Sequence, residues 1–151
     1  MTARPMTRAD APAVASLCTQ LGYDHTLPAL IVERLESSAH DHGCYVAEQD
    51  GAVIGWVEIF GVHMLISPHF FAEIGGLVVD TGARRQGVGR ALVSQAEAWA
   101  QARGYTEVRL RSGLHRAEAH QFYRSIGYEL AKTSHMFRKG LAAITEQEVD
   151  G

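Results

Sequence analysis

The chain has 151 residues, 46% of them hydrophobic, which favours a single folded domain with one core. Fourteen Lys and Arg against 17 Asp and Glu give a formal net charge of −3, so nothing in the overall charge attracts nucleic acid or an anionic membrane. The two cysteines, Cys18 and Cys44, follow no disulfide or metal spacing, and we find no signal peptide and no 18-residue apolar span. We therefore expect a cytoplasmic protein without nucleic-acid or membrane partners.

The N-terminal residues predict one strand followed by two helices. Residues 3–6 are expected to form the strand. Apolar residues spaced by three and four then predict a helix that Asp10 caps and Gly22 ends. A second helix is expected to carry Pro28 in its first turn.

A hairpin is the next expected element. Residues 44–48 and 52–60 are its two strands, and Gln49-Asp50-Gly51 is its turn. The run His40-Asp41-His42 precedes it. Two close histidines without further ligands nearby are typical of a solvated loop, so we expect no metal site.

The middle of the chain predicts a central strand and a long helix. Residues 70–79 form the strand, and a short turn, residues 80–83, follows. The helix runs from about Gly87 to Arg103 with one apolar face and ends at Gly104.

Three further elements complete the predicted order. Residues 105–111 alternate as a strand, and residues 115–126 carry a helical apolar pattern that Gly127 ends. Residues 128–139 read as two short strands or one bent strand. Strands and helices in this order predict an α/β protein built in layers.

Residues 84–90, Arg-Arg-Gln-Gly-Val-Gly-Arg, join the central strand to the long helix. The first turn of a helix has unpaired N–H groups, and the helix dipole adds partial positive charge there. Glycines let a bulky anion approach the backbone, and three arginines add full charges. This join therefore predicts a pyrophosphate site.

The same segment matches neither of two familiar phosphate motifs. A P-loop requires Gly-Lys followed by Ser or Thr, which is absent here. A Rossmann fingerprint requires a third glycine where this chain has Leu92, and the acid expected about 20 residues further on is missing.

Two signatures carry a resemblance to a known family. Residues 84–90 fit Arg/Gln-x-x-Gly-x-Gly/Ala, and residues 119–128 fit Ala-x-x-Phe-Tyr-x-x-x-Gly-Phe/Tyr. In both, the sequence resembles the GNAT acetyltransferase superfamily, and the element order agrees over nearly the whole chain. The resemblance implies a GNAT fold with a mixed central sheet of six or seven strands flanked by about four helices. It also implies a single domain, residues 1–141, followed by a loose acidic tail, residues 142–151.

The resemblance implies acetyl-CoA as co-substrate. The pantetheine arm would lie along the central strand, and the pyrophosphate would lie at the turn and the start of the long helix. Arg116 stands where the family often has an asparagine that contacts pantetheine. Because arginine donates but does not accept, Arg116 is expected to reach a phosphate instead. The implied cofactor-binding residues are Leu77, Val78, Val79, Arg84, Arg85, Gln86, Gly87, Val88, Gly89, Arg90 and Arg116.

Two residues are candidates for acid–base chemistry. Acetyl transfer to an amine requires a neutral amine and benefits from a proton on the departing thiolate. Glu73 resembles the catalytic glutamate of the histone-acetylating branch, with Glu58 or an ordered water chain as alternatives. Tyr123 resembles the tyrosine whose hydroxyl points at the thioester sulfur.

Three functions stay open at this stage. The favoured one is an N-acetyltransferase that transfers acetyl from acetyl-CoA to a primary amine of a small molecule, with a protein or peptide amine as a variant. The others are an acyl-CoA sensor without turnover and a nucleotide-binding protein. Because apolar Met136 and Phe137 lie near an expected sheet edge, we also expect a homodimer.

Overall fold

A computed structural model describes residues 1–37, 41–114 and 116–142 of the chain. The chain divides into two units, Met1–His115 and Arg116–Gly151, each described by itself below. His40 and residues 143–151 of the expected tail lie outside the described residues.

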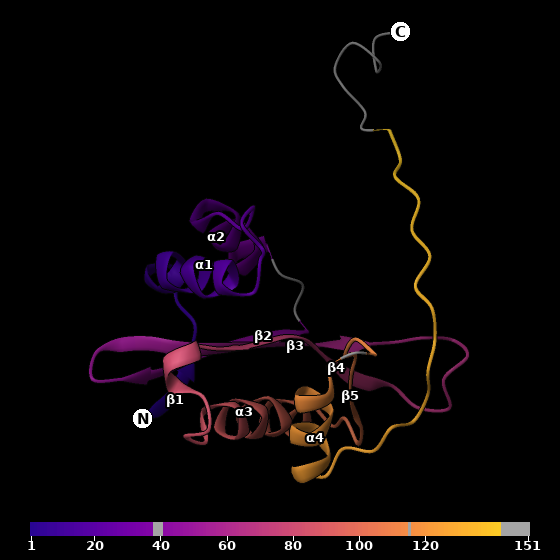
Figure 1. The fold of residues 1–151 in the computed structure, drawn as a ribbon. Helices are drawn as coiled ribbons and strands as arrows, with labels where there is room; N and C mark the ends of the chain where they lie inside the picture. The colour runs from indigo at the N-terminus through magenta and orange to yellow at the C-terminus, as the bar shows by residue number, and fades with distance from the viewer. Residues whose placement is uncertain (38–40, 115, 143–151) are drawn as a thin grey trace, which may run out of the picture. The chain divides into compact units, whose positions relative to one another are not determined.

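The first unit is built on a mixed sheet (Figure 1). Its five strands lie in the order β1-β2-β3-β4-β5, with antiparallel pairing up to β4 and parallel pairing between β4 and β5. This confirms the predicted layered α/β protein, with fewer strands in the described chain than the six or seven that the resemblance implied. The strands are β1 (Thr2–Pro5), β2 (His42–Gln49), β3 (Ala52–Val62), β4 (Phe71–Val79) and β5 (Val108–Leu110).

Helices cover both faces of this sheet. Helices α1 (Ala11–Gln20) and α2 (Pro28–Ser37) lie on one face, and α3 (Val88–Ala102) lies on the other (Figure 1). The apolar spacing predicted for α3 is confirmed, because the side chains that follow it are buried. The residues with no exposed surface, which form the centre of the core, are Val46, Ala47, Val57, Ile59, Ala72, Leu92 and Ala96.

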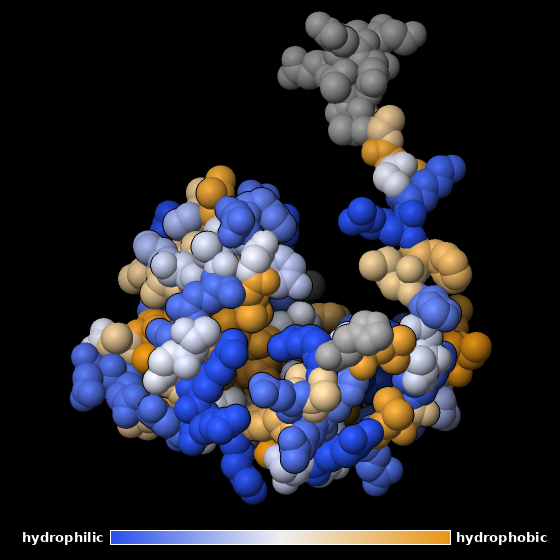
Figure 2. All heavy atoms as spheres, in the orientation of Figure 1, coloured by the Kyte–Doolittle hydropathy of each residue, from blue (hydrophilic) through white to orange (hydrophobic). Residues whose placement is uncertain are grey.

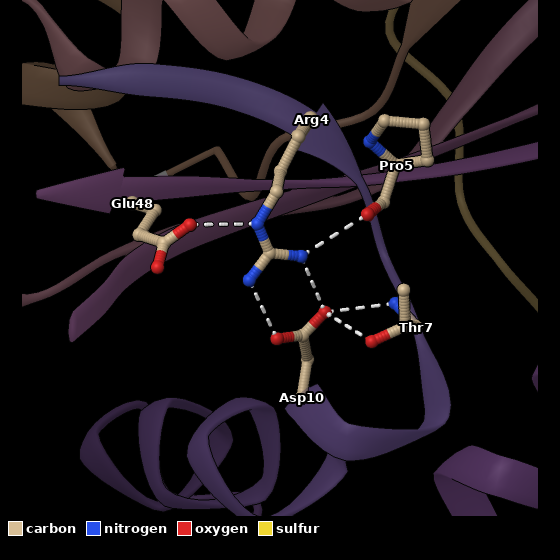
Figure 3. Close-up of polar contacts among 5 residues, drawn as sticks. All are labelled: Arg4, Pro5, Thr7, Asp10 and Glu48. Carbon is tan, nitrogen blue, oxygen red and sulfur yellow. Dashed lines mark hydrogen bonds and ion pairs between the residues drawn. The ribbon is translucent and has the colours of Figure 1, made fainter. Parts of the chain in front are cut away.

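An ion-pair network stabilises the β1–α1 corner, where the chain turns from β1 into α1 (Figure 3). Arg4 makes two hydrogen bonds to the Asp10 carboxylate, at 2.8 and 2.9 Å, and a third to Glu48 on β2 at 2.7 Å. The Thr7 N–H also donates to Asp10, at 2.8 Å. Asp10 stands at the N-cap position of α1 but makes no side-chain cap bond, because Arg4 and Thr7 take its oxygens instead. The expectation that Asp10 caps this helix is therefore wrong.

The second unit holds one helix, α4 (Ala117–Ser125), within its described residues. Residues 128–139, where two short strands or one bent strand were expected, contain no strand. A strand requires a neighbour for its backbone N–H and C=O groups, and the described residues of the second unit contain no strand that could pair with this stretch. Its large apolar side chains stand uncovered, as Figure 2 shows for the stretch; Leu130, Met136 and Phe137 are 70%, 82% and 93% exposed.

Candidate functional site

The turn between β4 and α3 has an unusual backbone. Arg85 has φ of 65° and Gly87 has φ of 80°, both in the left-handed region. A positive φ is uncommon for a residue other than glycine, and it needs support from the surrounding structure. Asp80 supplies part of that support by accepting a hydrogen bond from the Gly82 N–H at 2.9 Å, and Ala83 anchors the turn because it is buried.

Gly87 is the N-cap of α3, and its carbonyl accepts from the Ala91 N–H at 3.1 Å. The N–H groups of Val88, Gly89 and Arg90 have no hydrogen-bond partner among the described residues. The Val88 side chain is buried against the sheet, which fixes the helix start in place. The turn and the first turn of α3 thus present free donors at the positive end of the helix dipole.

The polar residues predicted for this site lie beside those donors along the chain. Arg84, Arg85, Gln86 and Arg90 are all exposed. Three guanidinium groups next to free backbone donors fit an anion that carries several charges. The structure therefore brings the predicted pyrophosphate residues together at one end of α3.

Strand β4 leaves one edge open beside this turn. Its parallel pairing with β5 covers only Ala72, Glu73 and Ile74. Residues 75–79, which include the predicted Leu77, Val78 and Val79, have a sheet neighbour on the β3 side only, within the described chain. An open strand edge is a template for an extended chain with amide groups, which can bond to it as an added strand.

A bulge shapes the start of this open edge. The β3–β4 register shifts between Glu58 and Ile59, so Gly75 is an extra residue on β4. A Cβ on Gly75 would lie 2.7 Å from Phe60 Cε1 and 3.1 Å from Glu58 Oε1, and one on Gly76 would lie 2.6 Å from Trp56 Cη2. The glycine pair thus lets three side chains of β3 lie across β4. The sequence analysis did not predict this feature, although adjacent glycines in a strand indicate that other groups approach its backbone closely.

Both candidate bases project from the same face of the sheet. Glu58 and Phe60 alternate onto one face of β3, and Glu73 pairs with Phe60 in the register. The Glu73 side chain is 20% exposed, and its Oε1 lies 3.7 Å from Arg111 Nε. Arg111 is 77% exposed, so water screens much of this ion pair. The two carboxylates therefore flank the bulge beside the open edge.

Glu58 also belongs to a cluster that the sequence did not predict. Its Oε2 lies 2.9 Å from His42 Nε2, and the Cys44 Sγ lies 3.5 Å from the same nitrogen. Burial, and then the negative charge of Glu58, raise the pKa of Cys44 to about 12. Sequence spacing hides this cluster because only the antiparallel register, which pairs Cys44 with Glu58, joins its members.

The remaining predicted residues lie in the second unit. Tyr123 is on α4, where its ring contacts Phe122 and Tyr128 at centroid distances of 5.4 and 6.3 Å. Burial raises the pKa of Tyr123, and the charge of Arg116 acts against that rise. Arg116 is the exposed N-cap residue of α4. Tyr123 therefore carries its proton at neutral pH.

Comparison with known proteins gives a consistent result. A model described as the acetyltransferase (GNAT) family matches residues 13–128. Aminoglycoside N(6′)-acetyltransferase type 1 of Stenotrophomonas maltophilia is 30% identical over 145 residues, covering 93% of this chain and 94% of the relative. N-acetyltransferase family 8 member 3 of Rattus norvegicus is 29% identical over 70% of this chain, but the match spans only 46% of that protein. The chain thus spans nearly the full length of one curated relative and about half of the other.

Solved structures share the fold. An aminoglycoside 6′-N-acetyltransferase in complex with the bisubstrate analogue CoA-S-monomethyl-acetylneamine superimposes with a TM-score of 0.81 at 19% identity, covering 93% of this chain and 98% of that one. No helix in the part of the chain that the structure describes has the length and apolar character needed to cross a membrane.

Proposed function

Because the chain belongs to the acetyltransferase (GNAT) family, we propose that it transfers acetyl from acetyl-CoA to a primary amine of a small molecule. The amine attacks the thioester directly while both substrates are bound. An aminoglycoside amine is the first acceptor to test, since a relative of nearly equal length is named for that activity.

One observation carries this proposal: the open edge of β4 leads directly into the turn and the free N–H groups of α3. Pantetheine is an extended chain with amide groups, and in CoA a pyrophosphate follows it. The edge at residues 75–79 suits the first part, and the donors at Val88, Gly89 and Arg90 suit the second. The two sites follow each other in the order in which CoA presents these groups.

The acetyl group would lie at the bulge, where Glu73 and Glu58 are available. Glu73 or Glu58 accepts a proton from the ammonium form of the acceptor, directly or through water, because only the neutral amine attacks. Tyr123, which is protonated at neutral pH, gives a proton to the CoA thiolate as the C–S bond breaks. Acceptor binding draws on the same two carboxylates, whose negative charge attracts a cationic amine.

The proposal is tested first by calorimetric titration with acetyl-CoA and then by release of the CoA thiol in the presence of amines. The amine panel contains an aminoglycoside, a polyamine and a peptide with a free N-terminus. We expect binding, followed by thiol release with a small-molecule amine and a product heavier by one acetyl group. Binding without turnover on any amine would support an acyl-CoA sensor, and turnover on the peptide alone would support a protein acceptor.

The order of the reaction has its own test. Initial rates measured while both substrates vary should give intersecting double-reciprocal lines, as expected when both must be bound before chemistry. Parallel lines would indicate an acetylated enzyme intermediate and would overturn direct attack.

A further inference from the structure

The cluster of His42, Cys44 and Glu58 offers three different ligand atoms to one point. Imidazole nitrogen, thiol sulfur and carboxylate oxygen all lie within 4.8 Å of one another. His42 and Cys44 are two residues apart on β2, so their side chains share a face, and Cys44 pairs with Glu58 across the strands. The backbone that carries the three groups is therefore held by sheet hydrogen bonds.

The spacing of these atoms fits a tetrahedral metal ion. Zinc bonds of about 2.3 Å to sulfur and about 2.0 Å to nitrogen place those two ligand atoms roughly 3.5 Å apart. The Cys44 Sγ to His42 Nε2 distance is 3.5 Å. The His42 Nε2 to Glu58 Oε2 distance is 2.9 Å, the length of a hydrogen bond, so a small outward rotation of the Glu58 carboxylate makes room for the ion.

We propose that His42, Cys44 and Glu58 form a binding site for zinc, with a fourth position open to water or a small ligand. Nitrogen and sulfur donors with one carboxylate favour zinc over magnesium or calcium, which prefer oxygen ligands. Zinc with a thiolate, a carboxylate and a neutral imidazole has no net charge, so the ion does not leave an unpaired charge in this partly buried place. On binding, the Cys44 proton passes to solvent, the neutral His42 imidazole takes the tautomer with its proton on Nδ1, and two metal bonds replace the His42–Glu58 hydrogen bond.

This site does not depend on the proposed acetyl transfer. Zinc binding would nevertheless affect acetyl transfer, and this consequence rests on the proposed function. Zinc would bind Glu58, whose Oε1 lies 3.1 Å from the position of a Cβ built on Gly75. Bound zinc would therefore remove one of the two candidate bases at the bulge.

A second His–Glu pair provides a matched control. His69 Nε2 lies 3.2 Å from Glu107 Oε2, but Arg109 Nη2 lies 3.0 Å from the same oxygen. A guanidinium there repels a cation, and neither His69 nor Glu107 is among the three residues of the cluster. Cys18 is the matched control for the thiol, because it is buried yet outside the cluster.

Cobalt titration followed by absorption tests the site, because Co²⁺ replaces zinc and a thiolate ligand adds a charge-transfer band in the near ultraviolet. We expect one Co²⁺ per chain, the thiolate band, and loss of the band when Zn²⁺ is added. Cys44→Ser should abolish the band, whereas Cys18→Ala and His69→Gln should keep it. Absence of the band in the wild-type protein, or its survival in Cys44→Ser, would overturn the proposal.

Zinc affinity measured by competition with a chromophoric chelator provides the second readout. Loss of a residue that only hydrogen-bonds to a metal ligand lowers metal affinity by roughly 10–100-fold. His42→Gln and Glu58→Gln remove ligands themselves, so each should lower zinc affinity by at least that much. Circular dichroism checks that each variant is folded, and acetyl-CoA titration of the same samples keeps this result separate from the proposed function. Zinc affinities equal to that of wild type in both folded variants would refute the site.

Discussion

Replacing Gly87 by valine tests the proposed pyrophosphate site, with a control just beyond the other end of the same helix. Gly87, before the first residue of α3, has φ of 80°, and Gly104, beyond its end, has φ of 85°. A Cβ at either position would meet nothing within 4 Å, so valine adds backbone strain without a clash. A branched residue in the left-handed region costs about 2 kcal/mol. The two substitutions therefore carry the same local cost at opposite ends of one helix.

That cost has different consequences at the two ends. The Gly87 turn is exposed, so part of the strain relaxes by changing the turn, and acetyl-CoA must restore its shape on binding. Because about 2 kcal/mol corresponds to about 30-fold in an equilibrium constant, we expect the acetyl-CoA Kd of Gly87→Val to rise by roughly 5- to 30-fold. Gly104→Val should lower the free energy of unfolding by a similar amount and leave Kd within about twofold of wild type.

Calorimetric titration with acetyl-CoA and urea denaturation of both variants provide the measurements. Gly89→Val should also weaken binding, whereas Arg84→Ala should have a smaller effect because salt screens an exposed charge. If Gly87→Val binds acetyl-CoA as tightly as Gly104→Val does, the turn does not hold the pyrophosphate and the assignment is wrong.

Three further predictions concern chemistry and assembly. Tyr123→Phe should lower kcat by roughly 100-fold with little change in acetyl-CoA affinity. If chemistry limits the rate and the variant keeps the wild-type kcat, Tyr123 serves only in packing. Glu73→Gln should lower kcat/KM at neutral pH and recover in part at high pH, where free amine is abundant. An unchanged profile would move the role to Glu58 or to water. Light scattering should give a mass above the 16.5 kDa of one chain, since Met136 and Phe137 are exposed near the C-terminus; a mass of one chain at micromolar concentration would contradict the homodimer.

Local patterns predicted the elements whose stabilising contacts are near in sequence. The α3 helix was placed within about a residue, because its apolar spacing and the left-handed Gly104 mark its face and its end. The hairpin and β4 were likewise predicted, since alternation and turn residues are local signals. Residues 128–139 show the limit of this reasoning: the local pattern indicates a strand, but a strand forms only where a neighbouring strand pairs with it.

The candidate site also has one part that local sequence predicts and one part that it does not. The proposed phosphate-binding segment, residues 84–90, is contiguous in sequence, so residue types and helix-end physics were enough to propose it. The bulge at Gly75 and the pairing of Cys44 with Glu58 depend on the register between strands, which a sequence does not display. The contact of Arg111 with Glu73 was missed for the same reason, because Arg111 directly follows β5 and reaches Glu73 only through the pairing of β5 with β4.

The Arg4–Asp10 pair is expected to hold the β1–α1 corner, and its contribution depends on pH. Arg4 holds the pKa of Asp10 below its usual range, which is about 3.9 in an unfolded chain. A carboxyl whose pKa is lowered by folding contributes stability that is complete above its unfolded pKa and is lost as pH falls through the folded pKa. The pair should therefore contribute fully at pH 7 and progressively less below about pH 4.

Asp10→Asn measures this contribution against a matched exposed pair. The Asp10 side chain is 7% exposed, whereas Arg8 and Glu36, also 2.8 Å apart, are 73% and 56% exposed. Losing charged hydrogen bonds to a buried carboxylate costs about 2 kcal/mol, whereas an exposed pair contributes about 0–1 kcal/mol. Urea denaturation at pH 7 should show that difference between Asp10→Asn and Glu36→Gln, and the gap between Asp10→Asn and wild type should narrow at pH 3. Equal costs for the two variants at pH 7 would mean that the corner does not depend on the buried pair.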